Sequence, residues 1–335
     1  MIHHLFPEIP PVVISGLAAV FALIMTFIAL SFFRRILPKD RGRAFASQAD
    51  VSVGKPTGAG LFFITSILIS ALVFLPVDPF TIFLYAVVFL SMIFGFLDDR
   101  AKKPWHEYIK GLLDLLVSLS AAVIFVMYAG TEMYLPFSGT FVQLPYYLFI
   151  PLATLLVWAS INVTNCTDGV DGLASSLSII SLLAFVGLAY LLGTTGSWTY
   201  LIPVAVFAIL AYLWFNTNPS LLLMGDAGSR GLGVFIALSA LFSKSPLSYL
   251  FICLVFIVDG GAGIVKISLK RFLKISVLKS IKTPIHDHFR DSGKADEDNS
   301  KKWKNQTVTV RFSLVSVFIC SVYLLAELIC SGILL

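Results

Sequence analysis

Five aspartates stand in three short polar stretches of an otherwise apolar chain, and their spacing suggests one shared site. They are Asp98 and Asp99 in FLDDRAKK, Asp168 and Asp171 in NVTNCTDGVDGLA, and Asp226 in LLLMGDAGSRG. Carboxylates that come together repel one another, and a bound hard cation or a raised pKa on one of them relieves the repulsion. These residue types therefore predict a site that takes a cation.

Magnesium is the cation that this composition predicts. It takes oxygen ligands, usually one or two carboxylates with phosphate oxygens and water, and the sequence offers no thiolate or imidazole cluster that would favour zinc. Glycines flank Asp171 and Asp226, where they permit tight turns and a close approach of backbone amides to a ligand. A cation beside amides at helix starts indicates diphosphate chemistry.

Each polar residue also has a simpler structural explanation. A pair such as Asp98 and Asp99 is often solvated at the end of a helix, and Asp226 can cap a helix N-terminus. A cap explains one of Asp168 and Asp171, but not both beside Asn162 and Asn165. Two further alternatives are that Asp259 pairs with a neighbouring helix and that His286 and His288, in TPIHDHF, are solvated loop residues.

The elements that must position these residues are membrane helices. Of 335 residues, 58% are hydrophobic and only 13% charged, which is too apolar for a soluble domain. We expect an all-α integral membrane protein, with residues 1–335 in a single polytopic membrane domain. Ten apolar runs are near the length that crosses a bilayer: 12–33, 58–77, 80–97, 111–129, 148–165, 171–192, 198–215, 229–243, 247–270 and 307–333.

Basic residues in the loops predict the orientation, because cytoplasmic loops carry an excess of Lys and Arg. They lie within 34–55, 100–110, at Arg230 and within 266–304, and among the loops only Lys244 falls on the opposite face. Both termini are therefore expected to be extracytoplasmic, and 130–147 becomes an external loop whose Ser-Gly turn suggests a small hairpin. Topology alone explains the basic excess, and attraction of anionic lipid or substrate is the alternative.

With this orientation the aspartates meet at the cytoplasmic edge of the membrane. Ionisable residues at membrane depth cost several kcal/mol unless they are paired or wetted, so several together mark a functional cavity. The polar stretch NVTNCTDGVDGLA is then expected to face a wet cytoplasmic cleft and not lipid.

Taken together, the motifs resemble one family of membrane enzymes. NVTNCTDGVDGLA, FLDDRAKK, WFNTNPSLLLMGDAGSRG and TPIHDHF are similar to those of the phospho-N-acetylmuramoyl-pentapeptide transferase family, within the polyprenyl-phosphate N-acetylhexosamine-1-phosphate transferase superfamily. The resemblance covers about 34 to 312. It implies ten transmembrane helices, both termini outside and a cytoplasmic active-site cleft, as the topology above predicts.

The resemblance implies magnesium-dependent transfer of phospho-N-acetylmuramoyl-pentapeptide from its UDP carrier to undecaprenyl phosphate, which yields lipid I and UMP for peptidoglycan synthesis. The enzyme would lie in the bacterial cytoplasmic membrane, with the lipid bilayer and both substrates as partners, no nucleic acid, and homodimerisation by family analogy. We favour direct attack on the β-phosphorus. Whether an aspartate accepts a proton, attacks covalently or only orients the acceptor stays open.

The roles of single residues also follow from the matching motifs. Asp226 would be the principal magnesium ligand, and Asp98 and Asp99 would lie by the lipid phosphate, with Asp98 a base or a phosphate-positioning group. His286 would contact the sugar-diphosphate region. The expected substrate-binding residues are Lys55, Lys102, Lys110, Asn165, Asp168, Asp171, Asn216 and His288, of which Asn165, Asp168, Asp171 and Asn216 line the nucleotide side.

The sequence departs from the family pattern in places. Asp287 stands where the family commonly has the middle of three histidines, and Leu223 where an aromatic residue can stack on uracil. Asp114 stands near a position that tends to be Gln, and Lys55 is expected to replace a family lysine in space. The sequence gives no account of Asp114.

Two alternative functions come from different classes. A sister enzyme would use UDP-N-acetylglucosamine with the same aspartates, although Thr283-Pro284-Ile285-His286 favours the muramoyl branch. A secondary transporter also carries intramembrane carboxylates, but typically at the bilayer midplane on broken helices of inverted repeats. A non-catalytic scaffold would not need the Asp, Asn and Gly constellation.

Overall fold

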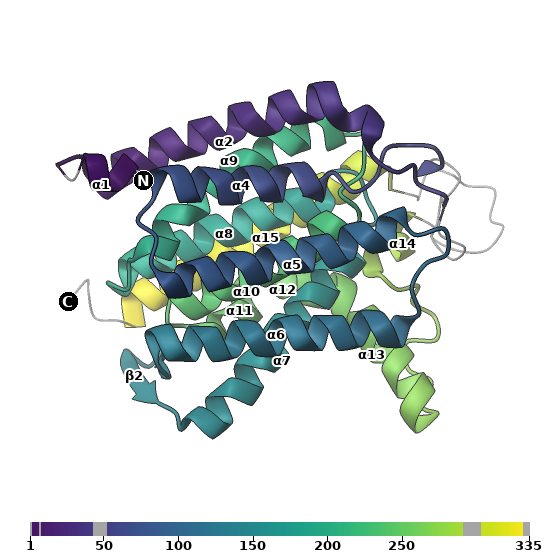
Figure 1. Cartoon of the computed structure of the whole chain (residues 1–335). Helices are drawn as coiled ribbons and strands as arrows, with labels where there is room; N and C mark the ends of the chain where they lie inside the picture. The colour runs from purple at the N-terminus through teal and green to yellow at the C-terminus, as the bar shows by residue number, and fades with distance from the viewer. Residues whose placement is uncertain (1, 7, 43–51, 291–302, 331–335) are drawn as a thin grey trace.

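The computed structural model describes residues 2–6, 8–42, 52–290 and 303–330 (Figure 1). Four of the basic loop residues (Arg43, Lys294, Lys301, Lys302) and the end of the last predicted span lie outside them. The elements are α1 Ile2–Leu5, α2 Pro11–Phe33, η1 Arg34–Ile36, α4 Gly60–Phe74, α5 Pro79–Arg100, α6 Glu107–Ala129, β1 Glu132–Leu135, β2 Thr140–Gln143, α7 Tyr146–Thr167, α8 Leu173–Leu191, α9 Ser197–Asn216, α10 Gly225–Phe242, η2 Pro246–Ser248, α11 Tyr249–Ile252, α12 Leu254–Phe256, η3 Ile257–Gly261, α13 Ala262–Ser268, η4 Leu269–Leu273, α14 Ile285–Arg290 and α15 Asn305–Cys330.

The helices confirm the prediction of an all-α, multi-pass membrane protein. Within the described ranges, seven helices are long and apolar enough to cross a membrane: α2 with η1, α5, α6, α7, α8, α9 and α15. The segment 246–273 is an eighth if its two parts, bent by 69° beside Cys253, form one span. Helix α4 is apolar but has only 15 residues. Each predicted apolar run thus falls on a helix, while the number of spans in the membrane stays a prediction.

Helix α10 lies at the centre of the bundle, and it is not among the described helices that are long and apolar enough to cross a membrane. Every residue from Gly225 to Leu241 is buried, and α10 packs against α4, α5, α6, α7, α8 and α9. A helix surrounded by protein need not be apolar along its whole length. It can therefore carry Asp226 and Arg230 in its first two turns, provided that neighbouring helices satisfy them.

Three features that bear on the site differ from the sequence prediction. Helix α10 begins at Gly225 and not near 229, so Asp226 lies inside its first turn. The ninth predicted span is broken, and π-helical turns at Ile257–Gly261 and Leu269–Leu273 follow the bend. The segment between the ninth and tenth predicted spans contains the short helix α14, which carries both loop histidines.

The two ends of the bundle differ in character. The small hairpin near 130–147 is confirmed, with Glu132 of β1 paired to Gln143 of β2 in antiparallel register. Figure 1 shows the hairpin, α1 and the C-terminal end of α15 at one end of the bundle, and α14 at the other. The site residues gather at the end with α14. Which of the two ends faces the cytoplasm remains a prediction from the basic loops.

A buried glutamate ties the hairpin to the last helix. Glu327 of α15 is 0% exposed, and its carboxylate accepts hydrogen bonds from the Tyr134 hydroxyl at 2.8 Å and the Phe137 amide at 3.0 Å. The Tyr134 amide donates to the carbonyl of Lys244 at 2.6 Å, and the Lys244 ammonium pairs with Glu132 at 2.5 Å. The hairpin is therefore fixed to both α15 and the segment after α10.

Candidate active site

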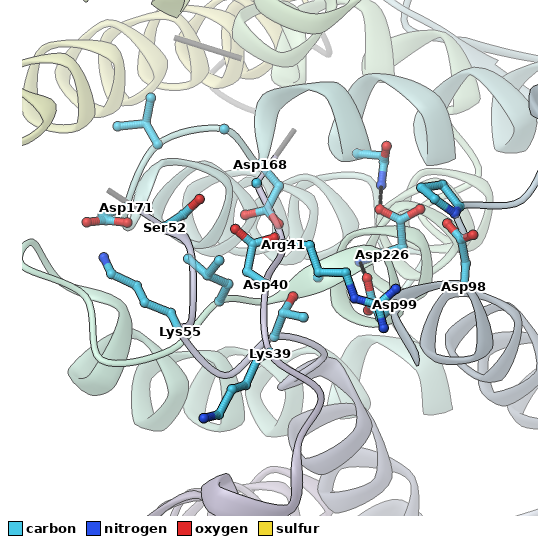
Figure 2. A pocket seen from close by; sticks show the side chains of 18 of the residues that line it. Lys39, Asp40, Arg41, Ser52, Lys55, Asp98, Asp99, Asp168, Asp171 and Asp226 are labelled. Carbon is cyan, nitrogen blue, oxygen red and sulfur yellow. Dashed lines mark hydrogen bonds between the residues drawn. The ribbon is translucent and has the colours of Figure 1, made fainter. Parts of the chain in front are cut away.

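A polar cavity of about 430 Å³ opens where several helices end (Figure 2). Asp98 and Asp99 come from the end of α5, Lys110 from the start of α6, Asn165 from the end of α7 and Asp226 from the start of α10. Helices that cross a membrane have their ends near its two faces, so residues far apart in sequence can meet where several of those ends come together. The lining is Lys39, Asp40, Arg41, Gly42, Ser52, Lys55, Thr57, Asp98, Asp99, Ala101, Pro104, Lys110, Asn165, Asp168, Gly169, Val170, Asp171, Asn216, Leu223, Gly225, Asp226, Arg290 and Asn305.

The cavity has two polar centres. In Figure 2, Asp98, Asp99 and Asp226 lie at one end, whereas Asp171 and Lys55 lie at the other, with Asp168 between them. The volume falls in the range of ordinary small-molecule sites. Separate polar centres in one cavity suit an elongated ligand that carries more than one charged or hydrogen-bonding group.

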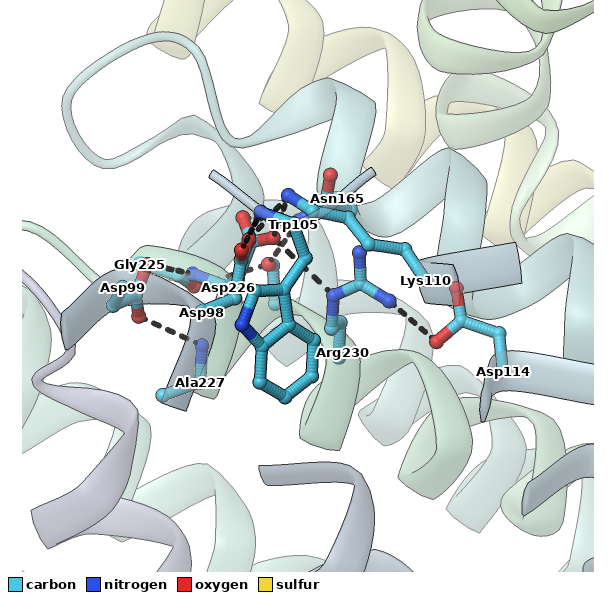
Figure 3. Close-up of polar contacts among 11 residues, drawn as sticks. Asp98, Asp99, Trp105, Lys110, Asp114, Asn165, Gly225, Asp226, Ala227 and Arg230 are labelled. Carbon is cyan, nitrogen blue, oxygen red and sulfur yellow. Dashed lines mark hydrogen bonds and ion pairs between the residues drawn. The ribbon is translucent and has the colours of Figure 1, made fainter. Parts of the chain in front are cut away.

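Lys110 joins the carboxylates of two helices at the first centre (Figure 3). Its ammonium forms an ion pair with Asp98 and lies 3.4 Å from Oδ2 of Asp226. The other oxygen of Asp98 accepts the Trp105 amide at 2.7 Å, so the α5–α6 link is folded over this carboxylate. Two buried aspartates are thereby held together by one cation, and their charges are partly offset.

Asp226 is only 8% exposed and is contacted from three helices. Asn165 of α7 donates to its Oδ1 at 2.9 Å and also to the Ser229 hydroxyl at 2.9 Å. Arg230, one turn along α10, donates from Nε to Oδ2 at 3.3 Å. Asn165 was predicted to line the nucleotide side, and here it orients the expected metal ligand.

Asp99 contacts the backbone of α10. Its Oδ1 accepts the Asp226 amide and its Oδ2 the Ala227 amide, each at 3.0 Å (Figure 3). Met224, the residue before the helix, makes no side-chain cap. Asp99 therefore supplies from another helix the carboxylate that normally caps an N-terminus, so Asp226 does not cap its own helix.

The close approach of α5 and α10 requires a glycine at position 225. Gly225 has a φ of +71°, and a Cβ there would lie 2.3 Å from Oδ2 of Asp99. A side chain at this position would be strained by the backbone and would also displace the capping carboxylate. The glycine before Asp226 thus serves the contact between two helices.

Arg230 and Asp114 form a buried ion pair that the sequence analysis missed. Nη1 of Arg230 contacts Oδ1 of Asp114 on α6, and the two residues are 7% and 5% exposed (Figure 3). The spacing of the charged residues in the sequence could have predicted this pair. Lys110 and Asp114 are four residues apart on α6, as Asp226 and Arg230 are on α10, so each pair shares one helix face.

The link between α7 and α8 places Asp171 at the second centre. The Asp171 carboxylate accepts the Ser220 hydroxyl at 2.8 Å and Nδ2 of Asn218 at 3.0 Å. Lys55 donates to the same Ser220 hydroxyl at 2.9 Å. Asp168 ends α7 and lines the cavity between the centres. Lys55, Asp168 and Asp171 thus all border the cavity, and their contacts with substrate stay predictions.

Asn216 and Lys102 stand apart from the other predicted substrate-binding residues. Asn216 also borders the cavity, but its amide accepts from the Gly172 amide at 2.8 Å and donates to the Leu222 carbonyl at 2.9 Å, which fixes the two loops around it. Lys102 is exposed and is not among the lining residues. Its carbonyl accepts from Arg41 at 2.5 Å.

The loop histidines are not part of the cavity lining. His286 is 2% exposed, and Asp259 accepts its backbone amide at 2.7 Å and contacts Nδ1 at 2.8 Å. Neither His286 nor His288 belongs to the lining, and Nδ1 of His288 accepts the Lys282 amide at 3.4 Å. Asp259 therefore pairs with a neighbouring helix, α14, which is the structural explanation that the sequence offered for it.

His286 touches the site through a glycine. A Cβ on Gly169 would lie 2.5 Å from Nε2 of His286, so the imidazole packs directly against the α7–α8 link. Asp287 pairs with Arg290 at 3.2 Å, and Arg290 donates to the Gly169 carbonyl at 3.1 Å. Helix α14 therefore supports the loop that carries Asp168 and Asp171.

Two arginines that line the cavity, Arg41 and Arg290, were used in the sequence analysis only to predict the membrane orientation. Arg290 is buried and lines the cavity beside Gly169. Arg41 lines it near α5 and donates to the Ala101 carbonyl at 2.7 Å, which satisfies the end of that helix. Nothing in their local sequence distinguishes them from the other basic loop residues, because their positions depend on how the loops fold back.

The donor set of the cavity fits magnesium. Among the described residues of the lining, the possible metal ligands are oxygen atoms, with no His or Cys. No group of three His, Cys, Asp or Glu in the described part of the chain could hold a metal by itself. Magnesium is usually bound by one or two carboxylates with substrate phosphates and water, so a complete protein cage is not expected.

The fold and the cavity define a polytopic membrane protein whose polar site is built from helix ends, and sequence comparisons place it among transferases. The model of Glycosyl transferase family 4 matches residues 81–244. The chain is 37% identical to the phospho-N-acetylmuramoyl-pentapeptide-transferase of Treponema pallidum strain Nichols, over 90% of this chain and 86% of the relative. The enzyme of the same name from Clostridium botulinum strain Eklund 17B is 31% identical, over 82% of each chain.

A third relative agrees. The phospho-N-acetylmuramoyl-pentapeptide-transferase of Brachyspira hyodysenteriae is 31% identical over 80% of this chain and 79% of its own. The chain belongs to the phospho-N-acetylmuramoyl-pentapeptide-transferase family, as its motifs predicted.

Proposed function

We propose that this protein transfers phospho-N-acetylmuramoyl-pentapeptide from UDP-N-acetylmuramoyl-pentapeptide to undecaprenyl phosphate, forming lipid I and UMP with magnesium. It would act in the bacterial cytoplasmic membrane, with the cavity open to the cytoplasm where the nucleotide substrate is found. Family membership supports the reaction, and the arrangement of the cavity supports the assignment of its parts.

The first centre suits the reacting phosphates. Asp226 would hold magnesium together with the donor's phosphate oxygens, and the bound ion would offset the charge that develops on them. Lys110 already lies against Asp226 and Asp98, which indicates that this position favours a cation. Arg41 and Arg290 line the same cavity and bring further positive charge toward a diphosphate.

The reaction needs positioning more than a strong base. One oxygen of undecaprenyl phosphate attacks the β-phosphorus, the bond from that phosphorus to the bridging oxygen breaks, and UMP leaves with this oxygen. A phosphate monoester has its second pKa near about 6, so its nucleophilic oxygen is largely ionised at neutral pH. Asp98 would then orient Lys110 and the acceptor, and alignment with charge neutralisation supplies the rate, as in other phosphoryl transfers.

The single observation that carries this proposal is the joining of Asp98 and Asp226 by Lys110 within one cavity at the helix ends. Asp98 lies in the last turn of α5 and Asp226 in the first turn of α10, so neither is in the middle of a helix. A secondary transporter would place them near the membrane midplane. The broken helix of this fold does carry an aspartate, Asp259, but that residue pairs with His286 of α14.

The experiment that tests the function is UMP release by purified protein in detergent with undecaprenyl phosphate. Each nucleotide donor, UDP-N-acetylmuramoyl-pentapeptide or UDP-N-acetylglucosamine, is supplied with magnesium or with EDTA. We expect turnover of the muramoyl donor only, abolished by EDTA and by Asp226→Ala. Turnover of the N-acetylglucosamine donor alone would assign the protein to the sister activity, and a folded protein that turns over neither would refute the proposal.

A further inference from the structure

Two facing helices carry four charges in an alternating arrangement beside the cavity. Helix α6 presents Lys110 and, one turn further, Asp114, while α10 presents Asp226 and then Arg230. Lys110 faces Asp226 at 3.4 Å, and Asp114 faces Arg230 in a closer contact. Each cation therefore has a carboxylate opposite it on the neighbouring helix (Figure 3).

Arg230 is shared unequally between its two carboxylates. Its Nη1 contacts Asp114 closely, whereas its Nε reaches Asp226 at 3.3 Å, beyond the usual range of about 2.7–3.2 Å for an N–H···O bond. A guanidinium presents a fork that binds a carboxylate through two parallel bonds when it is free to do so. Asp114 occupies one side of this fork, and Asp226 receives the longer contact.

Burial makes this arrangement expensive unless every charge is balanced. Asp114 and Arg230 are almost fully buried, and taking such a pair out of water costs several kcal/mol per ion. An apolar pair of similar size would fill the same space with less cost, so packing alone does not explain it. What the pair adds is a second carboxylate, so that the charge of Arg230 is shared between Asp114 and Asp226 and does not fall on Asp226 alone.

We propose that Asp114 is a positioning residue for the metal site: by taking the closer contact with Arg230, it limits the guanidinium to a single long contact with Asp226 and so lets Asp226 bind a divalent cation. This inference rests on the proposed function in taking Asp226 as the magnesium ligand. It also gives a role to Asp114, the departure from the family pattern that the sequence left without an account.

Electrostatics predicts the effect of each substitution. In Asp114→Asn the positive charge of Arg230 has only Asp226 to balance it, so the guanidinium moves onto Asp226 and competes with the metal. In the double variant Asp114→Asn/Arg230→Gln both charges are removed together, the local net charge is unchanged, and Asp226 keeps Lys110 and Asn165. Groups that orient a metal ligand typically change metal affinity about 10- to 100-fold when substituted.

The test measures metal binding directly and separately from transfer. Purified, EDTA-treated protein is titrated with Mn²⁺ alone, and free Mn²⁺ is read by electron paramagnetic resonance. We expect Asp114→Asn to bind Mn²⁺ about tenfold or more weakly than the wild type, and the double variant to bind within about threefold of the wild type. The Mg²⁺ concentration for half-maximal transfer should shift in the same order.

A matched control separates this effect from loss of any ion pair. Glu132 lies on the hairpin, at the other end of the bundle, and its carboxylate pairs with Lys244. Glu132→Gln neutralises this carboxylate and should leave Mn²⁺ affinity unchanged. Thermal unfolding of every variant establishes that it is folded. If Asp114→Asn does not fold, the double variant alone decides, because a tenfold loss of Mn²⁺ affinity in it would contradict the proposal.

The remaining outcomes distinguish the two proposals. Unchanged Mn²⁺ affinity in a folded Asp114→Asn, with an active wild type, overturns the role of Asp114 and leaves the proposed function standing. Equal loss in Asp114→Asn and the double variant shows that the pair is only structural. A wild type that neither binds Mn²⁺ nor releases UMP refutes the proposed function, and this inference with it.

Discussion

Asp99 caps the helix that carries Asp226. Both oxygens of the Asp99 carboxylate accept backbone amides from the first turn of α10, each at 3.0 Å, and Gly225 leaves the room for this contact. Adjacent aspartates of one motif thus have different surroundings, because Asp98 pairs with Lys110 while Asp99 holds the backbone of another helix. The position of Asp226 in the cavity depends on Asp99.

Asp99→Ala should lower both stability and transfer. Removal of a capping side chain typically lowers the free energy of unfolding by about 1 to 2 kcal/mol, and release of the first turn of α10 moves Asp226. Asp99→Asn keeps one carbonyl acceptor and should fall between Ala and the wild type in thermal unfolding. If Asp99→Ala unfolds like the wild type but loses transfer, Asp99 acts on the substrate directly.

Gly225→Ala should disturb the same contact from the other side. The added Cβ meets Asp99 at 2.3 Å in a backbone with a φ of +71°, so we expect a loss of about 1 to 3 kcal/mol of stability and a marked loss of transfer. Gly16→Ala is the matched control, because a Cβ at this position in α2 meets nothing within 4 Å. Thermal unfolding of the two variants should differ clearly, and equal melting temperatures would contradict the requirement for glycine.

Asp259 and His286 should behave as one unit. Because Asp259 holds both the backbone and the ring of His286, which packs on Gly169, loss of either residue releases the same loop. We expect the effects of Asp259→Asn and His286→Ala on transfer to be strongly non-additive in a double-mutant cycle. Additive effects would instead show that His286 contacts the substrate independently of Asp259.

Alkaline pH should weaken the attachment of the hairpin. Burial, together with the hydrogen bond to Glu327, raises the pKa of Tyr134 to about 12 from an ordinary value of 10.0. The phenol must stay protonated, so its contribution is complete below pH 10 and is lost as the pH rises through about 12.

The variant Tyr134→Phe should remove this pH dependence. It should also lower the free energy of unfolding at neutral pH by about 1 to 3 kcal/mol, the range for leaving a buried polar group without its hydrogen-bond partner. Tyr146→Phe is the control, since Tyr146 is 68% exposed. Thermal unfolding between pH 8 and pH 12 measures both effects, and a parallel decline in Tyr134→Phe and the wild type would assign the alkaline loss to other groups.

Local patterns predicted the fold class because they report on local physics. An apolar run of about 20 residues must hydrogen-bond its own backbone in a bilayer, so the positions of helices such as α2 and α9 follow from composition. The bend beside Cys253 and the short helix α14 were not predicted, because both depend on contacts such as that between Asp259 and His286.

The candidate site divides in the same way. The sequence by itself determined that Asp98, Asp99, Asp168, Asp171 and Asp226 are concentrated where helices end, since residue type and span length suffice for that, and it predicted one membrane face for all of them. Only the tertiary structure decided which aspartate touches which partner, and so separated the ion-paired Asp98 from the capping Asp99. It alone showed that Asp114 balances Arg230, because the pairing of buried charges is set by the packing of α6 against α10, and neither helix specifies that contact alone.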